Sequence, residues 1–426
     1  MLRHAAILLL TLCPAQAKVQ EFFTLKGHGG PIMGIATAAD GRIATASFDN
    51  AVGLWDGRSP QWLDGHEAAV NTVLFSEGIL YSAGDDFSVR RWPEGTPLGR
   101  HKGKVVDLCA VPGGIATASW DGSIGIWPRT GGTARMLTGH AAGVNAVVYS
   151  RTRDRLYSAG ADGTIRVWDL TSGTQERQLL RHGFGINELI LDPQEHWLAY
   201  GAVDGGTRII ELETGDTLAD LTLERRPVLA LALSPLGDQL AVGDGEGYIM
   251  IVDTQDWRIT HDFRATLKGP IWALAFSGDG QNIHAGGLDD TLYSWPVATL
   301  DRHGQMNVGD RSFLRDPMSM SNGERQFARK CSICHSLDPG SARRAGPTLY
   351  QVFGRSAGAV ADYQYSETLA ESDIIWTEDS INALFDLGPD HYIPGSKMPM
   401  QRITDPKDRD DLIAYLRQAT SKEPSE

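Results

Sequence analysis

LYSAGADGTIRVW, residues 156–168, joins a strand of small residues, an acidic turn and an apolar strand that ends in tryptophan. His140 lies before this stretch, separated from it by a further apolar run. The same order recurs through the first three hundred residues. Its closing positions are 35–43 residues apart and are Trp55, Trp92, Trp127, Trp168, Ile210, Val252 and Trp295. This period is typical of a four-stranded propeller blade, so seven units predict an all-β, seven-bladed ring.

Units one to four each contain a histidine, a hydroxyl residue, an aspartate and a tryptophan at matching positions. The sets are His28, Thr45, Asp49 and Trp55; His66, Ser82, Asp86 and Trp92; His101, Thr117, Asp121 and Trp127; His140, Ser158, Asp162 and Trp168. These residues resemble the WD-repeat family, and the resemblance implies a hydrogen-bonded network within each blade. Because the set recurs in successive units, we interpret it as architecture and predict no catalytic residue in it.

Units five to seven depart from this pattern. Their acidic positions are Asp204, Glu246 and Asp289, and their hydroxyl positions hold Tyr200, Val242 and Ala285. We expect apolar packing to replace the network there. The segment 19–25 precedes the first unit and is expected to supply the outer strand of the last blade, which would close the ring. The WD resemblance implies a rigid platform that binds another protein.

The first 17 residues, MLRHAAILLLTLCPAQA, have a basic start, an apolar core and an Ala-Gln-Ala ending. This pattern predicts a cleavable Sec signal peptide, and hence a soluble periplasmic protein. Leu12 is a poor fit before a lipidated cysteine, so we do not expect Cys13 to make a lipoprotein. No other segment is apolar enough to span a membrane. The net charge of −14 argues against nucleic acid as a partner.

The stretch 331–335, CSICH, contains two of the four cysteines in the chain. A zinc site would need two more soft ligands, and no second cysteine pair exists. A redox dithiol would need a βαβ context, which the neighbouring sequence does not offer. After a signal peptide, C-x-x-C-H is typical of covalent haem c attachment. Cys109 lies in an apolar strand-like run, and we predict no function for it.

The sequence around this motif resembles a class I cytochrome c of the mitochondrial type over nearly all of residues 320–420. The similarity includes a helix that begins with a capping box at Ser321 and Glu324, the segment 346–355 (GPTLYQVFGR), the segment 392–398 (YIPGSKM) and a C-terminal helix. The resemblance implies a small all-α domain with one covalent haem c. It implies thioether bonds to Cys331 and Cys334, with axial iron ligands His335 and Met398.

The same resemblance implies the residues around the ligands. Pro347 would accept a hydrogen bond from the second ring nitrogen of His335. Arg355, Tyr365 and Trp376 match residues that bind a haem propionate. The positions at which the two terminal helices would cross are Gly323, Phe327, Leu412, Tyr415 and Leu416. Met400 is an alternative iron ligand, but its spacing from the segment 392–395 favours Met398.

We therefore predict a signal peptide (1–17), a propeller (18–300), a linker (301–319) and a cytochrome c domain (320–426). The leading hypothesis is a periplasmic electron-transfer protein whose propeller docks a redox partner. In one alternative, the propeller holds a substrate site that the cytochrome serves as electron donor or acceptor. In the other, the chain is a haem-dependent scaffold or assembly factor. Residues 321–426 have a net charge of −4, which favours a basic or neutral partner, or docking guided by the propeller.

Overall fold

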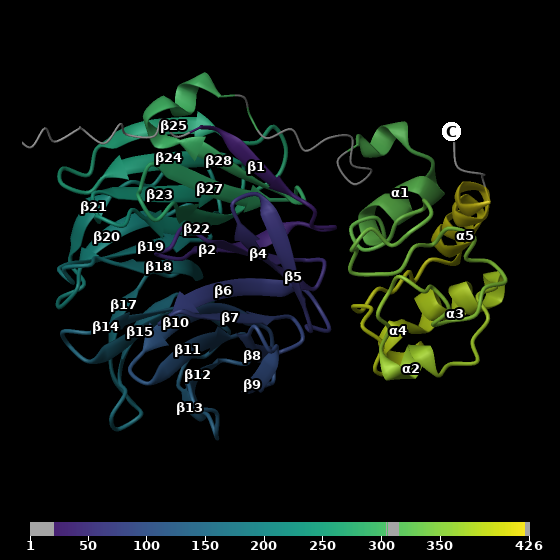
Figure 1. Ribbon diagram of the computed structural model, residues 1–426, viewed down its shortest axis with the longest axis horizontal. Helices are drawn as coiled ribbons and strands as arrows, with labels where there is room; N and C mark the ends of the chain where they lie inside the picture. Colours follow the sequence, from purple (N-terminus) through teal and green to yellow (C-terminus); the bar gives the residue numbers. More distant parts are fainter. Residues whose placement is uncertain (1–20, 304, 306–314, 422–426) are drawn as a thin grey trace, which may run out of the picture.

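The computed structural model describes residues 21–303, 305 and 315–421. The predicted signal peptide lies outside these residues. The described chain forms a propeller and a smaller helical domain, which lie side by side along the longest axis of the molecule (Figure 1). Among the described residues, no helix is both long enough and apolar enough to cross a membrane.

The propeller has seven four-stranded antiparallel sheets, as predicted. Blades one to three contain β2 (Ile32–Thr37), β3 (Ile43–Ser47), β4 (Ala51–Asp56) and β5 (Ser59–Asp64); β6 (Val70–Ser76), β7 (Ile79–Gly84), β8 (Ser88–Trp92) and β9 (Thr96–Arg100); β10 (Val105–Val111), β11 (Gly114–Ser119), β12 (Ser123–Pro128) and β13 (Arg135–Thr138). Blades four and five contain β14 (Val144–Ser150), β15 (Arg155–Gly160), β16 (Thr164–Asp169) and β17 (Thr174–Arg181); β18 (Ile186–Leu191), β19 (Trp197–Ala202), β20 (Thr207–Glu211) and β21 (Thr217–Asp220).

Blade six contains β22 (Val228–Leu233), β23 (Gln239–Asp244), β24 (Tyr248–Asp253) and β25 (Ile259–Arg264). Blade seven contains β26 (Ile271–Phe276), β27 (Asn282–Gly287), β28 (Thr291–Pro296) and, as its outer strand, β1 (Phe23–Lys26). The pairing of β1 with β28 confirms the predicted closure of the ring by the N-terminal segment. The inner strands of neighbouring blades also pack against one another around the whole ring, including β2 against β26.

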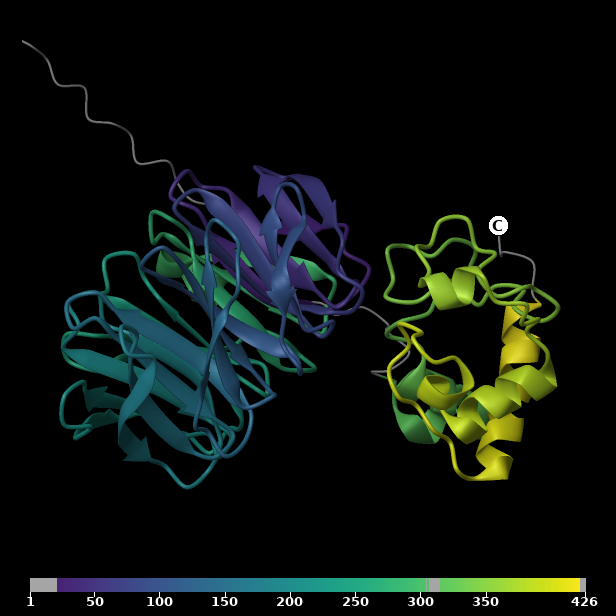
Figure 2. The ribbon, with the colours of Figure 1, turned by 90° about the horizontal axis from the view of Figure 1, so that it is seen from below.

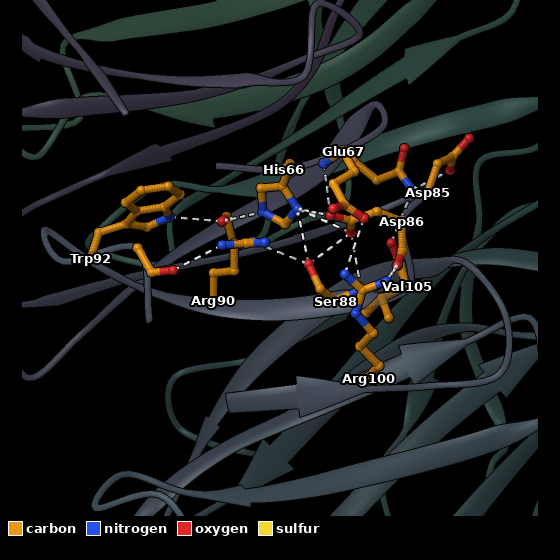
Figure 3. Close-up of polar contacts among 12 residues, drawn as sticks. His66, Glu67, Asp85, Asp86, Ser88, Arg90, Trp92, Arg100 and Val105 are labelled. Atoms are coloured by element: carbon orange, nitrogen blue, oxygen red, sulfur yellow. Dashed lines mark hydrogen bonds and ion pairs between the residues drawn. The ribbon is translucent and has the colours of Figure 1, made fainter. Parts of the chain in front are cut away.

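The hydrogen-bonded networks predicted for blades one to four are confirmed. In blade two, the His66 ring bonds through Nδ1 to Asp86 at 3.0 Å and through Nε2 to Ser82 at 2.7 Å (Figure 3). The Trp92 indole donates to the same Ser82 oxygen at 2.8 Å. Matching contacts join the corresponding residues of the other three blades. An aspartate thus fixes each imidazole, and the imidazole ties the turn to the strands.

Blade five corrects the expectation of apolar packing. The Tyr200 hydroxyl lies 3.3 Å from His182 Nδ1, and His182 Nε2 lies 3.0 Å from Asp204. The guanidinium of Arg208 also donates to the imidazole, at 3.1 Å. The longer tyrosine reaches the ring from a different direction, so a polar network survives in which the two ring nitrogens have exchanged partners.

Blade six corrects the assignment of Glu246 as the acidic residue of the turn. The side chain of Asp244 accepts hydrogen bonds from the backbone N–H groups of Glu246 and Tyr248, both at 2.9 Å. Arg225 pairs with Asp244 at 2.9 Å and lies over the Tyr248 ring. Apolar packing does occupy the hydroxyl position here, where Val242 is 5% exposed.

The helical domain follows two 3-10 turns: η1 (Val297–Arg302), which begins in the region predicted as propeller, and η3 (Pro317–Ser319), which lies in the predicted linker. Its helices are α1 (Asn322–Lys330), α2 (Glu367–Ala370), α3 (Glu378–Leu387), α4 (Pro389–Tyr392) and α5 (Pro406–Thr420). Ser321 caps α1 through the Glu324 N–H, but the Glu324 side chain pairs with Arg315, so only one half of the predicted capping box forms.

The two terminal helices, α1 and α5, cross at the predicted positions. A Cβ atom on Gly323 would lie 2.0 Å from the Asp411 carbonyl oxygen, so only glycine lets the helices approach this closely. One turn later the rings of Phe327 and Tyr415 are 5.7 Å apart, and Leu412 is fully buried beside them. The crossing fixes the end of α1, where the cysteine pair begins.

Candidate functional site

The cysteine pair lies in a turn that continues directly from α1. Cys331 is the C-cap of the helix, and the N–H groups of Cys334 and His335 both donate to its carbonyl oxygen, at 3.0 and 2.9 Å. Both thiols are free. Burial raises the pKa of Cys331 to about 12 and that of Cys334 to about 11. Thiols held in the protonated form do not suit a redox dithiol, whose chemistry requires a thiolate.

His335 is held by the segment that contains Pro347. Its Nδ1 donates to the Pro347 carbonyl oxygen at 2.7 Å, which leaves Nε2 as the nitrogen with a free lone pair. No described residue forms a hydrogen bond with Nε2. Burial lowers the pKa of the ring, so the neutral, ligating form is favoured. The segment that contains Pro347 therefore orients the ring so that the lone pair of Nε2 is available to an electrophile.

Gly346 makes this arrangement possible, and sequence reasoning assigned it no role of its own. A Cβ atom at this position would lie 2.4 Å from His335 Cε1, inside the imidazole ring's van der Waals surface. The Gly346 N–H also donates to the Cys334 carbonyl at 2.9 Å. The Gly-Pro pair helped to recognise the segment 346–355 in the sequence. The close approach of Gly346 to the His335 ring is visible only in the tertiary structure.

Three further predicted residues lie together. Arg355 donates to the carbonyl oxygens of Thr348 and Tyr350 at 2.7 and 2.8 Å, so its guanidinium is positioned by backbone. The Trp376 N–H donates to the Arg355 carbonyl at 2.9 Å, which places the two residues on adjacent segments. Burial lowers the pKa of Arg355, and the nearby Tyr365 hydroxyl opposes this shift. Trp376 is half-buried.

Met398 and Met400 occupy different surroundings. Met398 packs on the apolar cluster that includes Cys331, Leu384 and Leu412, and its N–H donates to the Ser396 side chain. Met400 is 53% exposed. The thioether of Met398 and the imidazole of His335 therefore belong to segments that meet at one apolar cluster, whereas Met400 lies outside it.

The cytochrome c family model matches residues 320–420. The chain is 41% identical over 107 residues to cytochrome c from Sesamum indicum, covering 25% of this chain and 94% of that protein. Cytochrome c from Theileria parva is 40% identical over 102 residues, with 24% of this chain and 87% of that protein covered. The chain belongs to the cytochrome c family. Its cytochrome c domain implies haem binding and electron transfer.

The family model of the WD domain, G-beta repeat, matches residues 20–56, 131–169 and 258–296. The structure of the WD40 β-propeller domain of Doa1 is similar, with a TM-score of 0.58. At 22% identity it covers 64% of this chain and 96% of its own chain, and it supports the fold alone. The cytochrome c domain is thus joined to a WD propeller, a fold that implies protein interaction.

Proposed function

We propose that this chain is a periplasmic electron-transfer protein with one covalent haem c, ligated by His335 and Met398, whose propeller docks a redox partner. One observation supports this most directly. His335 has a neutral ring, an Nδ1 engaged by Pro347 and an Nε2 without a protein partner among the described residues. It lies in the same turn as two buried, protonated thiols. This donor set fits haem c, which supplies reversible one-electron chemistry at its iron.

Covalent attachment of haem c would need only the two thiols of this site. Cys331 and Cys334 would hold the porphyrin through thioether bonds, in which each sulfur bonds to one carbon of a vinyl group and hydrogen to the other, so that no oxidant is consumed. Their spacing in one turn after α1 would hold one edge of the macrocycle against the helix end.

Two axial protein ligands would leave no coordination position for a substrate, which favours electron transfer over catalysis at iron. The apolar contacts of Met398 support it over Met400 as the second ligand. Arg355, fixed by two carbonyl oxygens, would present its remaining donors to a haem propionate, with Tyr365 and Trp376 beside it. A guanidinium held in this way suits a carboxylate.

Export is proposed from residues 1–17, because their basic start, apolar core and Ala-Gln-Ala ending are typical of a cleavable signal peptide. Fractionation of cells that express the full chain, followed by N-terminal sequencing, tests this step. A mature chain starting at Lys18 in the periplasmic fraction is expected. A cytoplasmic chain that retains residues 1–17 would contradict it.

The ligand assignment is tested on purified holoprotein. Intact mass spectrometry is expected to show one covalent haem, and its absence would refute covalent attachment. The ferric protein is expected to show a sulfur-to-iron charge-transfer band. Met398→Ala should abolish this band, while the matched control Met400→Ala should retain it. The reverse result would assign the ligand to Met400.

A further inference from the structure

The propeller has one face on which the histidine–aspartate turns of its blades lie, and we call it the histidine face. It includes the loops that precede β2, β6 and β26, and the turns between the second and third strands of each blade. The cytochrome domain contacts this face at blades one and seven, and in Figure 1 it lies beside β5. Figure 2 shows the helical domain next to the propeller from a second direction.

The contact at blade one is close and specific. The Arg343 guanidinium pairs with Asp64 at 2.5 Å and stacks over the Trp62 ring, 4.5 Å from its centroid. A Cβ atom on Gly29 would lie 2.3 Å from the Ala342 carbonyl oxygen. The cytochrome backbone therefore rests directly on the turn that His28 and Asp49 organise in blade one.

The cytochrome face in this contact is the one beside the predicted haem ligands. Ile333, which lies between the two cysteines, lines a small pocket together with Arg344 and the propeller residues Gly30, Pro31 and Leu288. Arg344 also donates to the Ser332 and Ile333 carbonyl oxygens, both at 3.2 Å. The propeller thus covers the surface of the turn that holds the thioether cysteines.

We propose that the histidine face over blades one and seven is a docking surface for this chain's own cytochrome domain, and that it covers the haem edge against protein-sized redox partners. The inference rests on the proposed haem site. Ile333, which lies between the two predicted thioether cysteines, lines the contact, so the covered surface adjoins the predicted attachment turn. An external partner must displace the propeller before it exchanges electrons at this edge.

The charges explain why such a contact would be reversible. Arg343 and Asp64 are 31% and 58% exposed, and an ion pair in such a setting contributes little and is screened by salt. The contact therefore depends on close shape fit at Gly29 as well as on charge. The opposite charges of Arg343 and Asp64 at blade one still favour this orientation of the domain.

Gly29→Ala tests the proposal, because the three nearest neighbours of the added methyl group all belong to the cytochrome domain. Gly278→Ala is the matched control, in a turn between β26 and β27 where the nearest atom would be 3.4 Å from the methyl group. Asp64→Lys and Arg343→Glu, singly and together, form a second and independent test. The single charge reversals should open the contact, and the double variant should restore it.

Two readouts are taken on holoprotein. Small-angle X-ray scattering measures the separation of the domains, and stopped-flow absorbance measures haem reduction by azurin, a protein-sized donor, and by hexaammineruthenium(II), a small one. Gly29→Ala should increase the radius of gyration and accelerate reduction by azurin about tenfold, the shift expected from a steric clash of this size. The small donor should react at nearly the same rate with every variant.

A wild-type radius of gyration equal to that of Gly29→Ala would overturn the docking. Equal azurin rates in an opened and a closed variant would overturn the covering of the haem edge. A wild-type protein without a haem c spectrum would refute the proposed function and, with it, the role of the contact in electron transfer. The scattering comparison would still decide whether the two domains dock.

Discussion

In both His66 of the propeller and His335 of the helical domain, the ring nitrogen Nδ1 forms a hydrogen bond. The two histidines differ in what the other ring nitrogen, Nε2, contacts. In blade two, His66 Nδ1 faces the Asp86 carboxylate and Nε2 accepts a hydrogen bond from the Ser82 hydroxyl. In the helical domain, His335 Nδ1 faces the Pro347 carbonyl, and Nε2 has no hydrogen-bond partner among the described residues. His66 is buried and His335 is half-buried, but only His335 has a lone pair to offer. The partner of Nε2 separates a structural histidine from a ligand.

The strongest test of this comparison removes one histidine from each domain. His335→Ala is expected to abolish the ligated haem spectrum while the propeller unfolds at an unchanged temperature. Circular dichroism at wavelengths specific for strand content, together with visible absorbance, separates these outcomes. A His335→Ala protein with an unaltered haem spectrum would show that another residue ligates the iron.

His66→Ala is the reciprocal change. It removes the imidazole from Asp86, which keeps its hydrogen bonds from Glu67 and Ser88, and is expected to lower the free energy of unfolding of the propeller by about 1–3 kcal/mol. The haem spectrum should not change, because His66 lies in blade two. Chemical denaturation monitored by tryptophan fluorescence measures the loss. A loss below about 1 kcal/mol, the usual net value of a single hydrogen bond, would show that the network adds little.

Acid should weaken the propeller networks in a defined window. Burial opposes ionisation of Asp121 and Asp162, but hydrogen bonds from neighbouring residues hold the pKa of each at about 2. Since an unfolded aspartate has a pKa of about 3.9, the stability these groups contribute is complete above that pH and is lost as pH falls toward about 2.

Burial also lowers the pKa values of His101 and His140 below 6.5, so protonation adds a milder loss of stability below that pH. Denaturation curves of the propeller from pH 7 to acid measure the combined effect. A free energy of unfolding that stays constant from about pH 4 to pH 2 would contradict the assigned carboxylate partners.

The smallest effect is expected in blade five. Tyr200→Phe removes the hydroxyl that lies 3.3 Å from His182, and should cost about 1 kcal/mol of unfolding free energy. Arg208 remains as a donor to the imidazole, so the network is weakened rather than broken. Ser158→Ala in blade four is the matched control and should cost more, because its oxygen contacts both His140 and Trp168. Equal costs would mean that the two networks contribute alike.

Some features required no tertiary information. The spacing of Trp55, Trp92, Trp127 and Trp168 predicted the blades, because each blade repeats one local hydrogen-bonding pattern along a continuous stretch of chain. The cysteine pair and His335 are adjacent in sequence, so their chemistry could be inferred from spacing alone. The WD and cytochrome c resemblances added the closure of the ring and the crossing of α1 and α5.

Other features were misjudged for identifiable reasons. Tyr200 was expected to end the network of blade five, but side-chain length and direction decide such contacts, and sequence position does not show them. Asp244 replaced Glu246 because an Asx-type turn forms from whichever acid lies two residues before the donor N–H groups. The net charge of −4 on residues 321–426 gave no sign of the basic Arg343 at the propeller contact, since net charge is a sum and carries no position.

The sequence by itself determined the repeat architecture, the covalent haem motif and the family of the C-terminal domain, all of which depend on residues close together in the chain. The tertiary structure alone decided that Gly346 makes room for His335 and that Met398 lies inside the apolar cluster while Met400 lies outside. It alone brought Arg343 onto Trp62 and Asp64, some 280 residues away, because contacts between domains depend on complementary surfaces that no local pattern records.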